Sequence, residues 1–247
     1  MKNKITIEIC CAGVEDAVTA YEAGADRIEL CSMIEIGGLT PSFGEFLLAK
    51  SLVDIPIVCL LRPRGGGFCY TQNEYLTMLS DGQLFAEAGA QGVAFGFLTE
   101  DGHIDLERTR MTAENLPGVT AVFHKAFDSS VESAEILPAL KEAGVERLLT
   151  AGKMPKALQG AREIGQYILS GCGLQIMAAG GVRKDNVGEV ISLSGVRQVH
   201  LALNKIQRDL SASHNSSLVG VFEQSHTALD KDLLKEFIRE VRLIAEA

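Results

Sequence analysis

The sequence predicts a single (β/α)8 barrel over residues 1–247, and three observations carry this prediction. A chain of 247 residues has the usual length of one such barrel. A pattern of helix end, glycine and short apolar strand recurs along the chain. Apolar runs of strand length also alternate with helical patterns throughout, which is typical of a parallel sheet. An open, doubly wound sheet is the alternative architecture.

The repeat is centred on four glycines that follow helical patterns: Gly24, Gly89, Gly144 and Gly195. The first three end a Glu-Ala-Gly motif, and a glycine suits the left-handed position just past a helix. The glycines are 65, 55 and 51 residues apart, about twice the ~30 residues of one strand-helix-strand unit. One further strand should therefore lie between each pair.

These spacings place eight strands along the chain in strict alternation with helices. The expected strands are residues 5–10, 55–61, 119–124 and 174–178, together with the apolar runs that follow the four glycines. The clearest helical patterns are residues 15–23, 73–88, 134–143 and 231–245. Eight such units close most simply into a barrel.

The composition excludes several classes of partner. A net charge of −9 argues against a broad surface for nucleic acid or for an anionic membrane, because phosphate binding needs concentrated Lys and Arg. The N-terminus leads directly into the first strand without an apolar signal-peptide core, so we expect a cytoplasmic protein. The six cysteines are scattered and form no Cys-x-x-Cys pair, which favours reduced thiols.

Residue parity in the first two strands predicts which side chains face the barrel axis. Successive side chains of a strand point to opposite faces. The isoleucines of the first strand therefore pack under the helices, while Glu8 and Cys10 face inward. Glu29 and Cys31 face inward from the second strand in the same way. Buried carboxylates need cations or hydrogen-bond donors nearby.

Suitable partners occur at the ends of the later strands and in the turns that follow them. They are Arg62, Arg64, His124, Lys125, Asp128, Gly180, Gly181 and His200. Because a barrel of this class carries its chemistry at the C-terminal ends of its strands, we expect these residues to converge at one mouth. A purely structural ion network is the alternative interpretation.

These motifs resemble those of the CutC family of copper homeostasis proteins along nearly the whole chain. The matching segments are residues 8–10, 24–31, 37–42, 62–66, 123–124 and 126–128. The resemblance implies a cytosolic barrel with a role in copper homeostasis, and it supplies no substrate. The chain departs from the family pattern at strand ends, so we expect a divergent ligand preference. The departures are Gly67, Lys125, Ala151, Lys153 and Leu201.

Copper binding is the first functional hypothesis. Cys10 and Cys31 share inward parity on neighbouring strands, and soft thiolate ligands select Cu(I). We therefore expect their sulfurs to lie close enough to share one Cu(I) ion. The alternative is that both cysteines are small residues that fill the core.

An enzyme acting on a small phosphorylated or carboxylated metabolite is the second hypothesis. Arg62 and Arg64 would hold the anion, aided by Lys125 and the Gly180-Gly181 turn. The candidate acid and base groups are Glu8, Glu29, His124, Asp128 and His200. No motif for an organic cofactor is evident. A scaffold barrel with a vestigial site is a third interpretation.

The segment 205–230 is unusually long for a connection between a strand and a helix. Long ordered loops in compact domains are commonly lids or binding loops. Because this segment leaves the C-terminal end of the eighth strand, it should emerge at the same mouth as the polar residues. We expect it to fold partly over the site or to pack on a partner subunit of a homo-oligomer.

Overall fold

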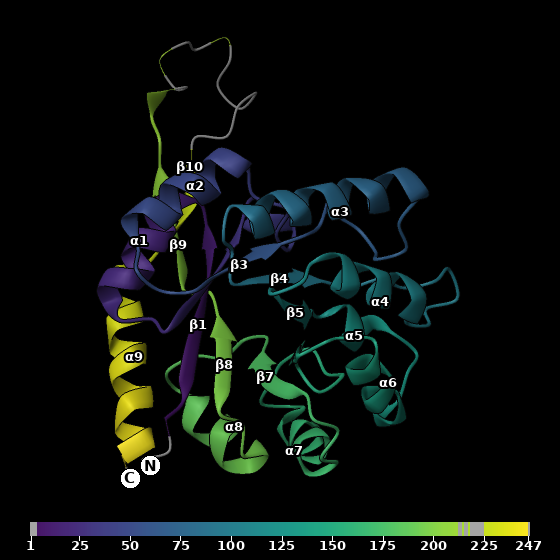
Figure 1. Cartoon of the computed structure of the whole chain (residues 1–247). Coiled ribbons are helices and arrows are strands. Elements are labelled where there is room, and N and C mark those ends of the chain that lie inside the picture. Colours follow the sequence, from purple (N-terminus) through teal and green to yellow (C-terminus); the bar gives the residue numbers. More distant parts are fainter. Residues whose placement is uncertain (1–3, 212–213, 215–216, 218–224, 247) are drawn as a thin grey trace.

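Eight parallel strands form a closed barrel in the order in which they occur along the chain (Figure 1). The computed structural model describes residues 4–211, 214, 217 and 225–246. Pairing of Glu8 on the first strand with His200 on the last closes the barrel and excludes an open sheet. The strands are β1 (Thr6–Ala12), β2 (Arg27–Cys31), β3 (Ile57–Leu60), β4 (Gly92–Phe95), β5 (Thr120–Phe123), β6 (Arg147–Thr150), β7 (Gln175–Ala179) and β8 (Gln198–Leu201).

Helices follow the strands and form the outer layer of the barrel (Figure 1). They are α1 (Val14–Ala23), α2 (Phe43–Leu52), α3 (Gln72–Glu87), α4 (Leu106–Asn115), α5 (Ala126–Ser129), α6 (Leu137–Glu142), α7 (Ala161–Leu169), α8 (Val187–Ser194) and α9 (Lys231–Glu246). Short 3-10 turns occur at η1 (Ile34–Ile36) and η2 (Ala134–Ile136). Among the described residues, no helix is both long and apolar enough to span a membrane.

The core has two layers, which the strand parity predicts. Ile7 and Ile9 belong to the large apolar layer between the strands and the helices. Cys10 and Cys31 belong to a smaller cluster inside the barrel, where they pack with apolar side chains of the other strands. The inward orientation expected for the two cysteines is therefore confirmed.

The structure describes residues 205–211, 214, 217 and 225–230 of the long loop expected after the eighth strand. Its ends form an antiparallel hairpin of β9 (Asn204–Arg208) and β10 (Ser225–Leu229), which projects from the barrel (Figure 1). Antiparallel pairing satisfies the backbone polar groups that an irregular loop would leave unpaired. The backbone N–H of Leu229 also donates to Asp16 at 2.8 Å, which anchors the hairpin on α1. Residues 212–213, 215–216 and 218–224 lie outside the described residues.

Candidate functional site

A cavity of about 720 Å³ opens at the C-terminal ends of the barrel strands. This volume suits a small metabolite. Its polar lining comes from seven of the eight strands or from the turns that follow them. The polar residues are Cys10, Glu29, Arg62, His124, Lys125, Asp128, Ser129, Lys153, Arg183 and His200. None of the described residues of the β9–β10 hairpin lines the cavity.

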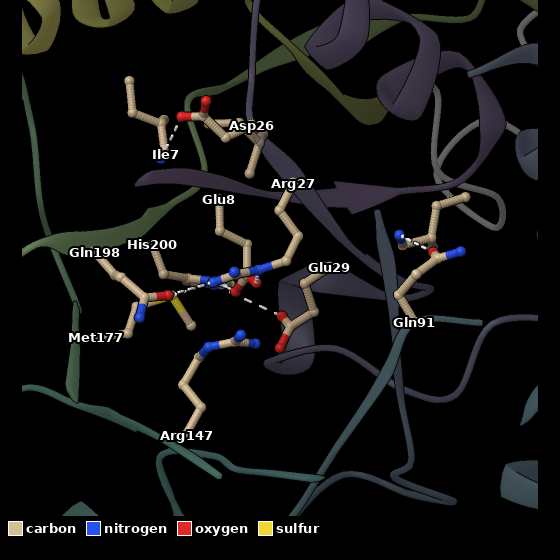
Figure 2. Close-up of polar contacts among 12 residues, drawn as sticks. Ile7, Glu8, Asp26, Arg27, Glu29, Gln91, Arg147, Met177, Gln198 and His200 are labelled. Carbon is tan, nitrogen blue, oxygen red and sulfur yellow. Dashed lines mark hydrogen bonds and ion pairs between the residues drawn. The ribbon is translucent and has the colours of Figure 1, made fainter. Parts of the chain in front are cut away.

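Glu29 and His200 form the floor of the cavity, and Glu8 lies behind them, outside the lining (Figure 2). His200 Nδ1 lies 2.8 Å from Glu8 Oε1, and it must be the donor because a carboxylate only accepts. His200 Nε2 lies 3.6 Å from Glu29 Oε2. The three side chains come from the adjacent strands β8, β1 and β2. Glu8 is only 1% exposed, whereas Glu29 and His200 reach the cavity.

Below this floor, Arg27 forms a buried ion pair with Glu8. Arg27 also donates to Gln198 at 2.9 Å. Figure 2 shows that the guanidinium of Arg147, from β6, points toward the same cluster of polar side chains. Neither arginine was singled out from the sequence. Two signals could have found them: Arg27 has the parity of Glu29, and the internal repeat places Arg147 in the position of Arg27.

The floor residues perturb one another's pKa values. Burial raises the pKa of Glu8, but the hydrogen bond from His200 and the charge of Arg27 outweigh it and lower the pKa to about 2. Burial raises the pKa of Glu29 above its usual value, and the nearby charge of Glu8 acts in the same direction. Burial lowers the pKa of His200, but Glu29 and Glu8 together raise it above its ordinary value. The cluster therefore combines a carboxylate that is held ionised, Glu8, with two groups facing the cavity, Glu29 and His200, that can take up or release a proton.

The two predicted metal ligands lie beside this floor. Cys10 Sγ and Cys31 Sγ are 3.6 Å apart, and all six cysteines of the chain are free thiols. Cys10 lines the cavity, while Cys31 is fully buried. Single ligand atoms of Cys10, Glu29 and His200 also lie within 4.8 Å of one another. The hydrogen bond with Cys31, followed by burial, raises the pKa of the Cys10 thiol well above its usual range.

Arg62 faces the cavity, but its guanidinium is already held by the protein. It donates to the carbonyl oxygens of Ile36, Gly38 and Gly66 at 3.0, 2.8 and 2.8 Å. These bonds use both terminal nitrogens, so Arg62 cannot clamp an anion with its two terminal nitrogens as the sequence suggested. Its Nε remains without a partner among the described residues.

Arg64 does not reach the cavity, which corrects the expectation that it shares an anion with Arg62. Its Nε lies 2.5 Å from Glu74 on α3, and its guanidinium stacks over the Tyr70 ring at 5.0 Å. Strand parity no longer controls side-chain direction beyond the end of β3. The glycine-rich turn leads Arg64 outward to Glu74 instead.

His124 lies at the end of β5, on the far side of the cavity from Glu8. Burial, with the charge of Arg62 acting in the same direction, lowers the pKa of His124 to about 3. The ring is therefore neutral at physiological pH. Its low pKa makes the ring a weak proton acceptor, and the neutral ring offers one N–H donor.

Asp128 lines the cavity but acts as a capping group. Its carboxylate accepts from Thr150 Oγ1 at 2.5 Å and from the backbone N–H groups of Ala151 and Lys153 at 2.8 and 3.0 Å. These bonds fix the turn after β6 and bring Lys153 to the cavity wall. A proton-transfer role for Asp128 is therefore not supported by its contacts.

The turn after β7 and Lys125 form one side of the cavity, as the sequence predicted. Gly180 and Gly181 both line it and have φ angles of 102° and 66°. A Cβ added to Gly180 would lie 3.2 Å from Lys125 Nζ and would also require a left-handed backbone. Lys125 therefore lies directly over the glycine turn, and Arg183 follows the turn in the lining.

The family model named CutC family matches residues 5–205 of the chain, most of its length. The chain belongs to the CutC family. A family protein CutC from Treponema denticola is 41% identical over 219 residues, covering 88% of this chain and 89% of the relative. One from Erwinia tasmaniensis is 40% identical over 225 residues, covering 91% and 88%.

Solved structures agree with this assignment. The crystal structure of CutC from Streptococcus agalactiae matches with a TM-score of 0.75 at 29% identity, covering 79% of this chain and 97% of that one. A thiamine phosphate pyrophosphorylase from Pyrococcus furiosus shares the fold alone, with a TM-score of 0.58 at 16% identity. Lys125, Lys153 and Leu201, three positions at which the sequence is expected to depart from the family pattern, line the cavity.

The stability of the protein should depend on the protonation of His200. Its pKa is raised on folding, so its stabilising effect is complete below the unfolded value of about 6.5 and is lost as pH rises through the folded value. Glu29, with its raised pKa, acts with the same sign. We expect the free energy of unfolding, measured in urea, to fall as the pH is raised above about 6.5.

Glu8→Gln tests the cause of this shift, because it removes the charge that holds the His200 proton. The pKa of His200, followed by NMR of labelled histidine, should drop by about 1 or more, equivalent to ~1.4 kcal/mol. Glu22→Gln is the matched control, since Glu22 pairs with Lys231 on the surface. An unchanged His200 titration in Glu8→Gln would contradict the arrangement.

Proposed function

We propose that this protein is an enzyme that holds a small phosphorylated or carboxylated metabolite in the mouth cavity and moves a proton on it. The observation that carries this proposal is the composition of the cavity. Cationic side chains surround its wall, and Glu29 and His200 meet at its floor. A concave site of this kind, at the C-terminal ends of barrel strands, is the usual place for catalysis in this fold.

The charges on the cavity wall favour binding of an anion. The chain as a whole carries a net charge of −9, yet four cations line the cavity: Arg62, Lys125, Lys153 and Arg183. Among the described lining residues only Glu29 and Asp128 carry a carboxylate, and that of Asp128 is bound to the turn after β6. A concave surface of one sign raises the local concentration of oppositely charged ligands. Lys125 and the Gly180-Gly181 turn provide the binding side for a phosphate or carboxylate group.

The floor supplies the groups that move the proton. Glu8 accepts from His200 Nδ1 and thereby directs Nε2 toward Glu29 and the cavity. An imidazole oriented in this way can donate or accept a proton at Nε2. Glu29 faces the same space, so a substrate between the cations and the floor meets two exchangeable groups. Glu8 and Arg27 act as positioning residues.

Exchange of substrate hydrogen with solvent tests this proposal. Pooled phosphorylated and carboxylated metabolites incubated with the protein in D₂O should include at least one that gains deuterium, as measured by mass spectrometry. Glu29→Gln and His200→Gln should each slow the exchange by about 100-fold or more, the usual contribution of a general acid or base.

The matched control is Arg110→Gln, because Arg110 is an exposed cation on α4, away from the mouth cavity. This variant should exchange at the rate of the parent. A pool in which no member gains deuterium, or a Glu29→Gln His200→Gln double variant that exchanges normally, would overturn the proposal.

Cu(I) binding is a second candidate function, favoured by the distance of 3.6 Å between Cys10 Sγ and Cys31 Sγ. Thiolate sulfur is the ligand type that selects Cu(I), so the residues fit this ion. Cys10 and Cys31 would hold it, with Glu29 and His200 beside them. The S. agalactiae relative is named for copper homeostasis, which supports the same candidate.

Anaerobic titration with Cu(I) against a competing chelator tests the second candidate. The parent should bind one ion per chain, and Cys10→Ser or Cys31→Ser should weaken binding by at least about 100-fold, because losing a ligand costs more than losing a neighbour of one. Cys69→Ser is the control, since Cys69 is exposed. If the Cys10 and Cys31 variants bind as tightly as the parent, this candidate fails.

A further inference from the structure

Two buried nitrogen donors in the cavity wall have no hydrogen-bond partner among the described residues. They are His124 Nε2 and Arg62 Nε. Both side chains line the cavity, and each is only 6% exposed. Burying a donor without a partner is costly, and most buried polar groups in folded proteins are satisfied. Two such donors in one cavity therefore point to a ligand oxygen.

The hydrogen bonds of His124 determine which nitrogen carries the proton. The backbone N–H of Ala126 lies 3.2 Å from Nδ1, which must accept. The Nδ1 edge of the ring also faces Gly96, where an added Cβ would lie 2.6 Å from Nδ1. The proton of the neutral ring is therefore on Nε2, on the side away from this backbone. His124 thus presents an uncharged N–H donor.

Arg62 is held rigidly beside His124. Its terminal nitrogens donate three of their four N–H groups to carbonyl oxygens of the surrounding turns, which leaves one N–H of Nη2 and the N–H of Nε, and Nε has no partner among the described residues. The Phe68 ring lies next to both groups, with its centroid 5.5 Å from Arg62 Cζ and 5.1 Å from the His124 ring centroid. Neither donor can turn away without breaking these contacts. Donors fixed in this way need no reorganisation when charge develops.

We propose that the substrate is a carbonyl compound and that His124 and Arg62 bind its carbonyl oxygen as this oxygen becomes an enolate. This inference rests on the proposed function, because it names the substrate class of the same site. The two donors come from β5 and the end of β3, and the groups that move the proton come from β8 and β2. The end of β3 lies next to β2, and β5 lies farther round the barrel, so a carbonyl compound held between these strands would have its oxygen near the two donors and its adjacent C–H near Glu29.

The reaction then balances within the site. Glu29 removes the proton from the carbon next to the carbonyl group, and the C–H electron pair forms a C=C bond. The carbonyl π pair moves to oxygen, where the N–H groups of His124 and Arg62 stabilise the negative charge. Return of a proton from His200 or Glu29 to the same carbon restores the carbonyl group. No oxidant, reductant or further reactant is consumed, so the reaction class is epimerisation at the carbon next to a carbonyl group.

Oxalate, a planar dianion that resembles an enolate, is a direct probe of these donors. In ¹⁵N-histidine-labelled protein, oxalate should shift the Nε2–H proton of His124 downfield, as expected for a hydrogen bond to a charged oxygen. His124→Phe should weaken oxalate binding, measured by calorimetry, by about 10- to 100-fold, since it removes a donor to a charged group. His103→Phe is the control, because His103 is exposed on another loop.

The outcomes separate this inference from the proposed function. If a substrate exchanges deuterium and His124→Phe slows that exchange about 100- to 1,000-fold, the inference and the proposed function are both supported. If His124→Phe exchanges and binds oxalate like the parent, the enolate site is overturned while the proton-transfer function stands. An oxalate effect on His124 without any deuterium exchange would support the oxygen site and overturn the function. If His124→Phe does not fold, the measurement on the unmutated protein is the test. An Nε2–H signal of His124 that does not move at saturating oxalate, or a protein that does not bind oxalate, overturns the inference.

Discussion

Glu8 lies inside the barrel between Arg27 and His200, and a buried carboxylate of this kind needs both of them. At 1% exposure its lost hydration must be replaced by charges and donors. Arg27 comes from β2 and His200 from β8, so one carboxylate on β1 joins three adjacent strands at the seam where the barrel closes. The same contacts fix the His200 ring and direct its Nε2 toward Glu29. The orientation of His200 at the cavity floor therefore depends on the hydrogen bond that the buried Glu8 carboxylate requires.

The buried ion pairs inside the barrel are not explained by the stability of the fold. Replacing buried ion pairs by well-packed apolar side chains is often neutral or stabilising, so a barrel interior needs no such group to fold. The cavity wall shows the same pattern, since Arg62 and Asp128 use their charges to hold turns while facing the cavity. Rigid turns, cations on the wall and exchangeable groups on the floor are the features of a preorganised site. Local conflict with the rules of stability is expected where a protein carries out its function.

Much of this arrangement could be predicted from the sequence because strands impose a period of two. Parity placed Glu8 and Glu29 inside the barrel, and the glycine repeat located the strands. Beyond a strand end the period no longer applies. Arg64 therefore follows its turn outward to Glu74, where parity could not place it. The cap formed by Asp128 depends on the conformation of a distant turn, and the pairing within 205–230 joins strands separated by a long connection.

The most direct test of the account is a crystal structure of the His200→Gln protein grown with the pooled phosphorylated and carboxylated metabolites. Removing one proton-transfer group should allow a bound substrate to persist. We predict an anion whose charged group contacts Lys125 and the Gly180-Gly181 turn and whose reacting carbon lies about 3–3.5 Å from Glu29, the distance of a reactive complex. A cavity that takes up no metabolite, or a metabolite bound only outside the barrel mouth, would contradict the account.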